Sequence, residues 1–345
     1  MNKRQSRALS MIDVARTRGL EIGPLDRPVV TKEMGEVAYV DHATASALKE
    51  KYDGDPGVNV DQIVEVDFVH SDRPLVDCVE GDNFDYVVAS HTIEHVPDVV
   101  GWLREVAEVL TEGGVLSLVI PDKGFTFDYL RPPSTPSEMI DSYLLGSRRP
   151  TFRQVYESLA MSVELDVEEA RVWPGVVDVE GLRFLHTEES ALEGARRATD
   201  GEYVDAHCWV FTPQSFFDAI RFLIRLDLFD YKVCHFLPTP EGELEFYVSL
   251  EKLPSSSALD ERRSGQLDSI PLQESPDRRY RVIPGLEMDG LDDARRRLEA
   301  VTMELADERR SGLRRWADVH PWSERVRLAM PHRWGLLDRV MRDRW

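Results

Sequence analysis

The chain has 345 residues, of which 42% are hydrophobic, and its formal net charge at pH 7 is −21. This length suffices for one sizeable core with residues left for an appendage. The negative charge repels a polyphosphate, so we expect no nucleic-acid partner. Three scattered cysteines, Cys78, Cys208 and Cys234, fit neither a disulfide framework nor a paired-cysteine zinc site.

The N-terminal segment is charged and lacks an apolar core, and no later apolar run could cross a bilayer. We therefore expect a cytoplasmic protein without a transmembrane segment. Ten arginines against four acidic residues make the segment 309–345 basic, in contrast to the acidic remainder of the chain.

Short apolar runs alternate with helical or turn-rich segments in the first part of the chain, which predicts a doubly wound, mostly parallel sheet. The predicted strands are Gly19–Gly23, Val37–Val40, Ile63–Val66, Tyr86–Ala89 and Val115–Ile120. The clearest predicted helix is Asp98–Leu110, which "TEGG" would close with a C-terminal glycine.

After Pro121 the pattern is irregular for about ninety residues, and we interpret residues 122–211 as an inserted, ordered lid. A helix is predicted to begin at Thr212, an N-cap followed by Pro213. Two late strands, Tyr231–Leu237 and Leu244–Leu253, are predicted to pair as an antiparallel hairpin at the sheet edge, giving about seven strands.

The composition changes beyond Leu253. We expect a main domain over 1–253, a flexible linker over 254–285, and a helical tail over 286–345 that holds a short coiled-coil seam and the basic segment. This tail could bind an anionic membrane surface or a peripheral partner, or form a homo-oligomer; the alternative is a helix folded back on the acidic domain.

The stretch "GLEIGPLDRP", residues 19–28, ends the first predicted strand at the edge where open α/β sheets bind ligands. Two prolines remove backbone donors from the turn after Gly23, and a dinucleotide pyrophosphate needs such donors. NAD is therefore disfavoured. Asp41 follows the second strand, where a carboxylate can accept both hydroxyls of a ribose.

Five segments in order, "GLEIG", "VAYVDH", "VEVDF", "FDYVVASHTIEHVPD" and "GGVLSLVIPD", resemble the class I S-adenosylmethionine-dependent methyltransferases, and within them the type 11 small-molecule subgroup. The resemblance covers about residues 15–253. It implies a Rossmann-like α/β sheet and S-adenosyl-L-methionine as the cofactor.

The resemblance also implies roles for individual residues. Glu21 would support the methionine end of the cofactor, Gly23 would let the backbone approach it, and Asp41 would bind the ribose. Asp67 and Phe68 would meet the adenine, while Ser90 and His91 would lie beside the methyl group. Asp26 would add negative charge near the cationic sulfonium. The alternatives are a half-buried strand-end carboxylate for Glu21 and a surface turn for Asp67 and Phe68.

Methyl transfer needs alignment of the acceptor and, for a poor nucleophile, a base. The candidate catalytic residues are His207, His95 and Asp122, and a packed structural imidazole is the alternative for His95. We predict no metal, although Asp122, Asp128 and His207 together could hold a divalent ion.

Three arginines, Arg131, Arg148 and Arg149, could contact an anionic acceptor, or they could simply balance local acids. The resulting hypothesis is a methyltransferase that acts on a hydroxyl of a small polar acceptor such as a sugar or glycan precursor, with an amine as the other acceptor type. The alternative is a non-catalytic, methyltransferase-like scaffold in a glycan or membrane-associated complex.

Overall fold

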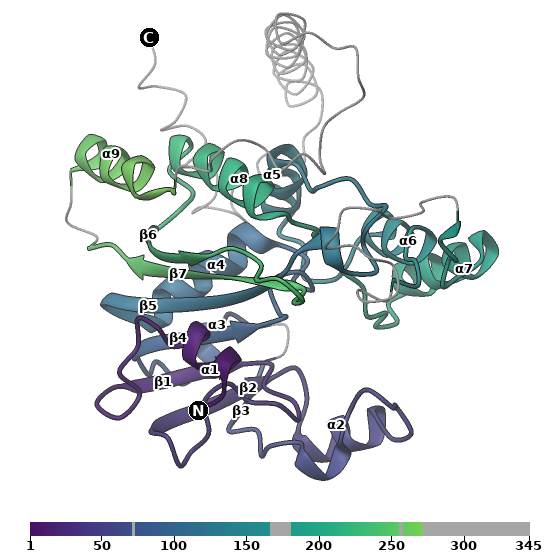
Figure 1. Ribbon diagram of the computed structural model, residues 1–345, viewed down its shortest axis with the longest axis horizontal. Helices are drawn as coiled ribbons and strands as arrows, with labels where there is room; N and C mark the ends of the chain where they lie inside the picture. The colour runs from purple at the N-terminus through teal and green to yellow at the C-terminus, as the bar shows by residue number, and fades with distance from the viewer. Residues whose placement is uncertain (71–72, 166–180, 255–257, 272–345) are drawn as a thin grey trace, which may run out of the picture. The chain divides into compact units, whose positions relative to one another are not determined.

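The computed structural model describes residues 1–70, 73–165, 181–254 and 258–271, and contains a seven-stranded sheet (Figure 1). The strand order is β3-β2-β1-β4-β5-β7-β6. The first five strands in sequence are parallel, and β7 is antiparallel to both β5 and β6. This arrangement confirms the predicted fold class, with an antiparallel hairpin at one edge. The strands are β1 Arg18–Ile22, β2 Glu36–Asp41, β3 Phe68–Val69, β4 Phe84–Ser90, β5 Leu110–Pro121, β6 Tyr231–Leu237 and β7 Glu245–Lys252.

Helices cover both faces of the sheet, because the strands alternate their apolar side chains between two cores. Along β4, Val87 and Ala89 join the core beneath α4 and α8, whereas Tyr86 and Val88 join the core beneath α1. Figure 1 shows α1 in front of the sheet and α4 behind it. The α-helices are α1 Lys3–Ala8, α2 Ala45–Lys51, α3 Leu75–Cys78, α4 Val99–Val109, α5 Pro136–Leu145, α6 Phe152–Ala160, α7 Glu188–Thr199, α8 Pro213–Arg225 and α9 Leu259–Ser269, and the 3-10 turns are η1 Val60–Gln62 and η2 Lys123–Phe125.

Helix α8 begins as predicted, with Thr212 as N-cap and Pro213 in the first turn, and Ser215 completes a capping box. The described residues of the inserted segment form three α-helices that the sequence pattern did not predict. Helix α5 packs against α4 and α8, whereas α6 and α7 pack on each other around Val155 and Ala195. The described part of the insertion is therefore helical, with its own small core.

Three local predictions are wrong. Residues 63–66 form no strand; the third strand is the two-residue β3, which lies further along the chain. The segment "TEGG" does not cap α4, because β5 already begins at Leu110 and Gly113 adopts a φ of 77° inside that strand. The third concerns residues 259–269, which fall within the range 254–285 that was predicted as a flexible linker.

Within that range, α9 packs on β6 and α8, and it buries Gln266 and Ile270. The Gln266 amide donates to the backbone oxygens of Phe229 and Tyr231, at 2.7 and 2.9 Å. Residues 259–269 therefore belong to the folded domain. The tail over 286–345, with its coiled-coil seam and basic segment, lies outside the described residues. No helix among the described residues has the length and apolarity needed to cross a lipid bilayer.

Candidate functional site

A pocket of about 480 Å³ opens at the carboxyl ends of the parallel strands. It lies where the strand order reverses between β1 and β4, the usual ligand crevice of an open α/β sheet. The sheet side, the start of α4 and the insertion all contribute to its wall. The lining residues with polar side chains are Asp41, His42, His70, Thr92, His95, Asp98, Trp102, Glu105, Ser147, Arg148, Arg149, Glu202 and Tyr203.

Gly23 lines this pocket directly after β1 and needs its glycine backbone there. Its φ is +67°, its N–H donates to the Val40 oxygen at 2.9 Å, and an added Cβ would lie 3.2 Å from the Thr92 hydroxyl. A side chain at this position would be strained and would crowd the pocket floor.

Glu21 does not line the pocket. Its side chain is 1% exposed, and its two carboxylate oxygens accept the N–H groups of Val29 and Val30 at 2.6 and 2.9 Å. Burial raises the pKa of Glu21 to about 7, despite these two hydrogen bonds. The Glu21 carboxylate thus stabilises the conformation of the loop after β1 through hydrogen bonds to Val29 and Val30.

Asp26 also lies away from the pocket. It is buried in the same loop, where it accepts the Asn59 N–H at 2.9 Å and contacts the Arg27 guanidinium at 3.5 Å. Glu21 and Asp26 therefore both accept hydrogen bonds from backbone N–H groups of the protein and do not line the pocket.

Asp41 lines the pocket at the end of β2 and is 7% exposed. Its Oδ1 accepts the backbone N–H of His42, at 2.7 Å. The His42 ring stacks on Tyr203 from the insertion, with centroids 5.6 Å apart, and Lys51 lies 4.5 Å above the Tyr203 ring. Tyr203 therefore closes the β2 side of the pocket.

The predicted adenine pair, Asp67 and Phe68, does not line the pocket. Asp67 accepts the Tyr39 N–H at 2.8 Å and pairs with Lys32 at 2.9 Å, and Phe68 packs against the main core. The reason is the position of β3: these residues enter the strand rather than follow it. The residue that follows the strand is His70, which lines the pocket and which the sequence analysis missed.

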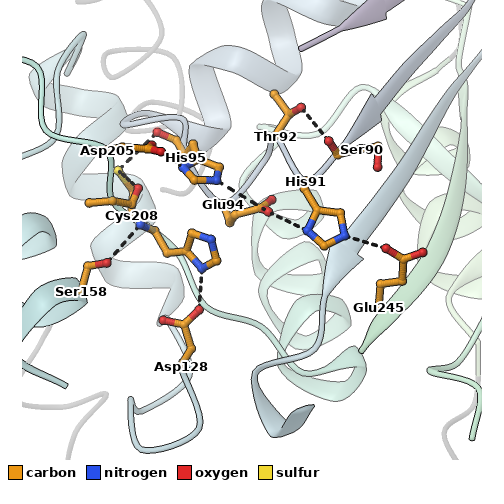
Figure 2. Close-up of polar contacts among 12 residues, drawn as sticks. Ser90, His91, Thr92, Glu94, His95, Asp128, Ser158, Asp205, Cys208 and Glu245 are labelled. Carbon is orange, nitrogen blue, oxygen red and sulfur yellow. Dashed lines mark hydrogen bonds and ion pairs between the residues drawn. The ribbon is translucent and has the colours of Figure 1, made fainter. Parts of the chain in front are cut away.

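Ser90 and His91 lie at the end of β4, beside the pocket but outside its lining (Figure 2). The Ser90 hydroxyl accepts from Arg4 at 2.5 Å, and the His91 Nε2 contacts Glu245 at 2.6 Å. Burial alone would raise the pKa of Glu245, but the hydrogen bond from His91 and the charge of Arg4 lower it to about 2. These residues join the β4 end to β7 and to α1.

His95 is the one predicted catalytic residue that lines the pocket. Its Nδ1 lies 2.9 Å from the Asp205 carboxylate, and its ring meets the His207 ring edge-on with centroids 4.7 Å apart. Burial lowers the pKa of His95, but the contact with Asp205 and the charge of Glu94 outweigh burial and raise it. Sequence reasoning named neither Glu94 nor Asp205 as a site residue, although both adjoin named histidines.

His207 lies behind His95 and is 8% exposed. Its Nδ1 contacts the Asp128 carboxylate at 2.5 Å, and the other Asp128 oxygen accepts from Arg131 at 2.7 Å. Burial opposes ionisation of Asp128, yet His207 and Arg131 hold its pKa below the usual value. Arg131 thus forms a buried ion pair with Asp128 and does not line the pocket where a methyl acceptor would bind.

Asp122 lies outside the pocket, at the start of η2. Its carboxylate accepts from the Gly124 N–H at 3.0 Å and from the Thr239 hydroxyl at 2.7 Å. It therefore shares no site with Asp128 and His207, and the metal trio considered from the sequence is not brought together.

Arg148 and Arg149 do line the pocket, on the side of the insertion. Arg148 pairs with Glu105 of α4 at 2.7 Å, and Arg149 donates to the Gly201 oxygen at 2.7 Å. Arg148 thus links the insertion to α4, whereas the Arg149 bond lies within the insertion, and both guanidinium groups contribute positive charge to an otherwise acidic lining.

A family model described as "Methyltransferase domain" matches residues 7–216. No curated protein matches the chain in sequence. Among solved structures, the CcbJ methyltransferase from Streptomyces caelestis is 20% identical with a TM-score of 0.26, over 38% of this chain and 56% of that chain. The CurJ carbon methyltransferase is 13% identical with a TM-score of 0.32, over 71% of this chain and 51% of that chain.

A SAM-dependent methyltransferase from Methanosarcina mazei is 16% identical with a TM-score of 0.35, over 71% of this chain and 95% of that chain. The matches to CcbJ and CurJ thus span about half the length of those chains. The family match covers most of the sheet, with its pocket at the strand ends. The chain therefore belongs to the class I S-adenosylmethionine-dependent methyltransferases.

Proposed function

We propose that this chain transfers a methyl group from S-adenosylmethionine, bound in the pocket at the strand ends, to a hydroxyl of a small polar acceptor such as a sugar or glycan precursor. The observation that carries the proposal is that Gly23, Asp41 and His95 line one pocket at the switch point of the sheet. Gly23 and Asp41 are suited to bind the adenosyl part of the cofactor. His95 supplies a titratable group beside it.

The size and charge of the pocket support a cationic cofactor. Its volume of about 480 Å³ falls within the range of small-molecule sites. Asp41, Asp98 and Glu202 give the wall a negative character that favours a sulfonium and disfavours a diphosphate. The loop after β1 also has few donors to offer a phosphate, because Glu21 already accepts two of its N–H groups.

The acceptor would lie against the insertion, which we propose acts as a lid. The sulfonium is already activated, so the protein has to align the hydroxyl with the methyl group and stabilise the loss of its proton. His95 is the group placed for this, and His207 acts through it as a positioning residue. Because Asp122 faces Thr239, the proposal gives it no catalytic role.

Calorimetry with S-adenosylmethionine tests the cofactor site. Asp41→Asn should weaken binding by about 10- to 100-fold, because it removes a charged acceptor from the pocket. Asp67→Asn is the matched control, since Asp67 was an equal candidate in the sequence but lies outside the pocket lining. No binding by the wild-type chain, or an equal loss in both variants, would refute this site.

The acceptor can be identified by labelling. Incubation of the chain with methyl-labelled cofactor and a cell extract should label a small polar molecule, whose chemical analysis distinguishes an O-methyl from an N-methyl product. Binding of the cofactor without any labelled product would favour the non-catalytic scaffold instead.

A further inference from the structure

Glu94 is a fully buried carboxylate near two histidines. Its exposure is 0%, and neither of its side-chain oxygens accepts a hydrogen bond from any described residue. Two imidazoles lie near its Oε1: the His91 Nδ1 at 3.6 Å and the His95 Nε2 at 4.0 Å (Figure 2). An unpaired buried carboxylate is costly, so a group of positive charge is needed beside it.

Two of the histidines near this carboxylate are oriented in the same way. The Nδ1 of His95 contacts Asp205 at 2.9 Å, and the Nδ1 of His207 contacts Asp128 at 2.5 Å. In each ring, therefore, Nδ1 lies beside a carboxylate, and Nε2 is the available ligand atom. Carboxylates hold the histidine ligands of metal ions in this way, where they set the tautomer and the ring orientation.

The three side chains come together from distant parts of the chain. One potential ligand atom from each of Glu94, His95 and His207 lies within 4.8 Å of the others. Ligands bound at about 2.1 Å in tetrahedral geometry are roughly 3.4 Å apart, so binding would require the ligand atoms to approach one another by up to about 1.4 Å. Rotation of the Glu94 carboxylate can supply the part of this movement that concerns Glu94, because no hydrogen bond from the described residues restrains it.

We propose that Glu94, His95 and His207 bind one divalent metal ion of the zinc class. Two imidazoles and one carboxylate favour a borderline ion such as Zn²⁺ over Mg²⁺ or Ca²⁺, which prefer oxygen ligands. Three protein ligands also leave a coordination position for a substrate atom or water. His95 lines the pocket, so that position would be next to the acceptor.

The metal site does not depend on the proposed function, but its use in the reaction does. A hydroxyl bound to such an ion loses its proton more easily than in water. The ion would then take over from His95 the task of stabilising the loss of the hydroxyl proton, with His95 and His207 as its ligands.

Cobalt substitution tests the proposal on the full-length protein. After treatment with a chelator, the wild-type chain should bind about one equivalent of Co²⁺ and develop visible d–d absorption. Glu94→Gln and His207→Gln should each weaken Co²⁺ binding by at least about 100-fold, because each removes one ligand of three. His186→Gln is the matched control, since His186 is exposed and outside the cluster.

Near-ultraviolet circular dichroism would verify that each variant is folded. Glu94→Gln is the main variant, because glutamine preserves the shape of the side chain. Failure of the wild-type chain to bind Co²⁺ stoichiometrically would overturn the proposal and favour an imidazolium as the partner of Glu94. Equal binding by wild type and Glu94→Gln would overturn it as well. Calorimetry with S-adenosylmethionine separates the two proposals, because Asp41→Asn should lose the cofactor and retain Co²⁺.

Discussion

Replacement of Glu21 by glutamine tests how the loop after β1 is held. The Glu21 carboxylate is 1% exposed and accepts the N–H groups of Val29 and Val30. Burial raises its pKa from 4.5 to about 7, and the two hydrogen bonds oppose that rise only in part. The folded protein therefore binds a proton at Glu21 more tightly than the unfolded chain does.

This raised pKa predicts a definite pH dependence of stability. The favourable contribution of the protonated group is fully present below the unfolded pKa near 4.5, and it is lost as the pH rises through the folded pKa of about 7. At about 1.4 kcal/mol per pKa unit, the difference corresponds to about 3 kcal/mol. Glutamine does not titrate, so Glu21→Gln should abolish this part of the pH dependence.

Urea unfolding of the wild type and of Glu21→Gln between pH 4.5 and pH 8 measures the effect. The free energy of unfolding of the wild type, relative to the variant, should fall by about 3 kcal/mol across this range. Glu241→Gln, at an exposed position, should leave the wild-type pH dependence unchanged. A wild-type-minus-variant difference that is constant across the range would mean that Glu21 ionises in the fold as easily as in water, and the reasoning would be wrong.

Three further substitutions probe the core and the pocket. Asp128→Ala leaves the Arg131 guanidinium buried without its carboxylate and should lower the free energy of unfolding by about 3–5 kcal/mol in urea titrations. Gly19→Ala places a Cβ 1.9 Å from the Tyr86 ring and should cost about 1–3 kcal/mol, seen as a lower Tm. Tyr203→Ala removes the ring that stacks on His42 and should weaken S-adenosylmethionine binding by roughly 10-fold in calorimetry, whereas Tyr203→Phe should keep most of the affinity.

The strands that were predicted correctly are those that a local run of apolar residues is enough to identify. β1, β2, β4 and β5 carry apolar runs, and their predicted ranges overlap the observed ones. β3 has only two residues, so its position depends on its pairing with Val40 and Asp41 and not on periodicity. A small error there placed Asp67 instead of His70 directly after the strand, and so misplaced the expected adenine site.

In the candidate site, too, some residues could be predicted from their local sequence, whereas others depend on contacts between distant parts of the chain. Gly23 and Asp41 follow directly from their places at strand ends, so they could be found from the sequence. The Asp128–His207 contact joins residues 79 positions apart and depends on how the insertion folds. Nothing in the order of residues 122–211 shows that Asp128 and Asp205 each orient a histidine.

The pocket wall is formed partly by the strand ends of the sheet and partly by the insertion. The strand ends supply Gly23 and Asp41, which belong to the framework shared by the family match. The insertion supplies Tyr203, and it also places Asp128 and Asp205 beside the Nδ1 atoms of His207 and His95. A change at Tyr203 should therefore affect the proposed cofactor side of the pocket, whereas a change at Asp128, which contacts His207 and Arg131, should affect the histidines.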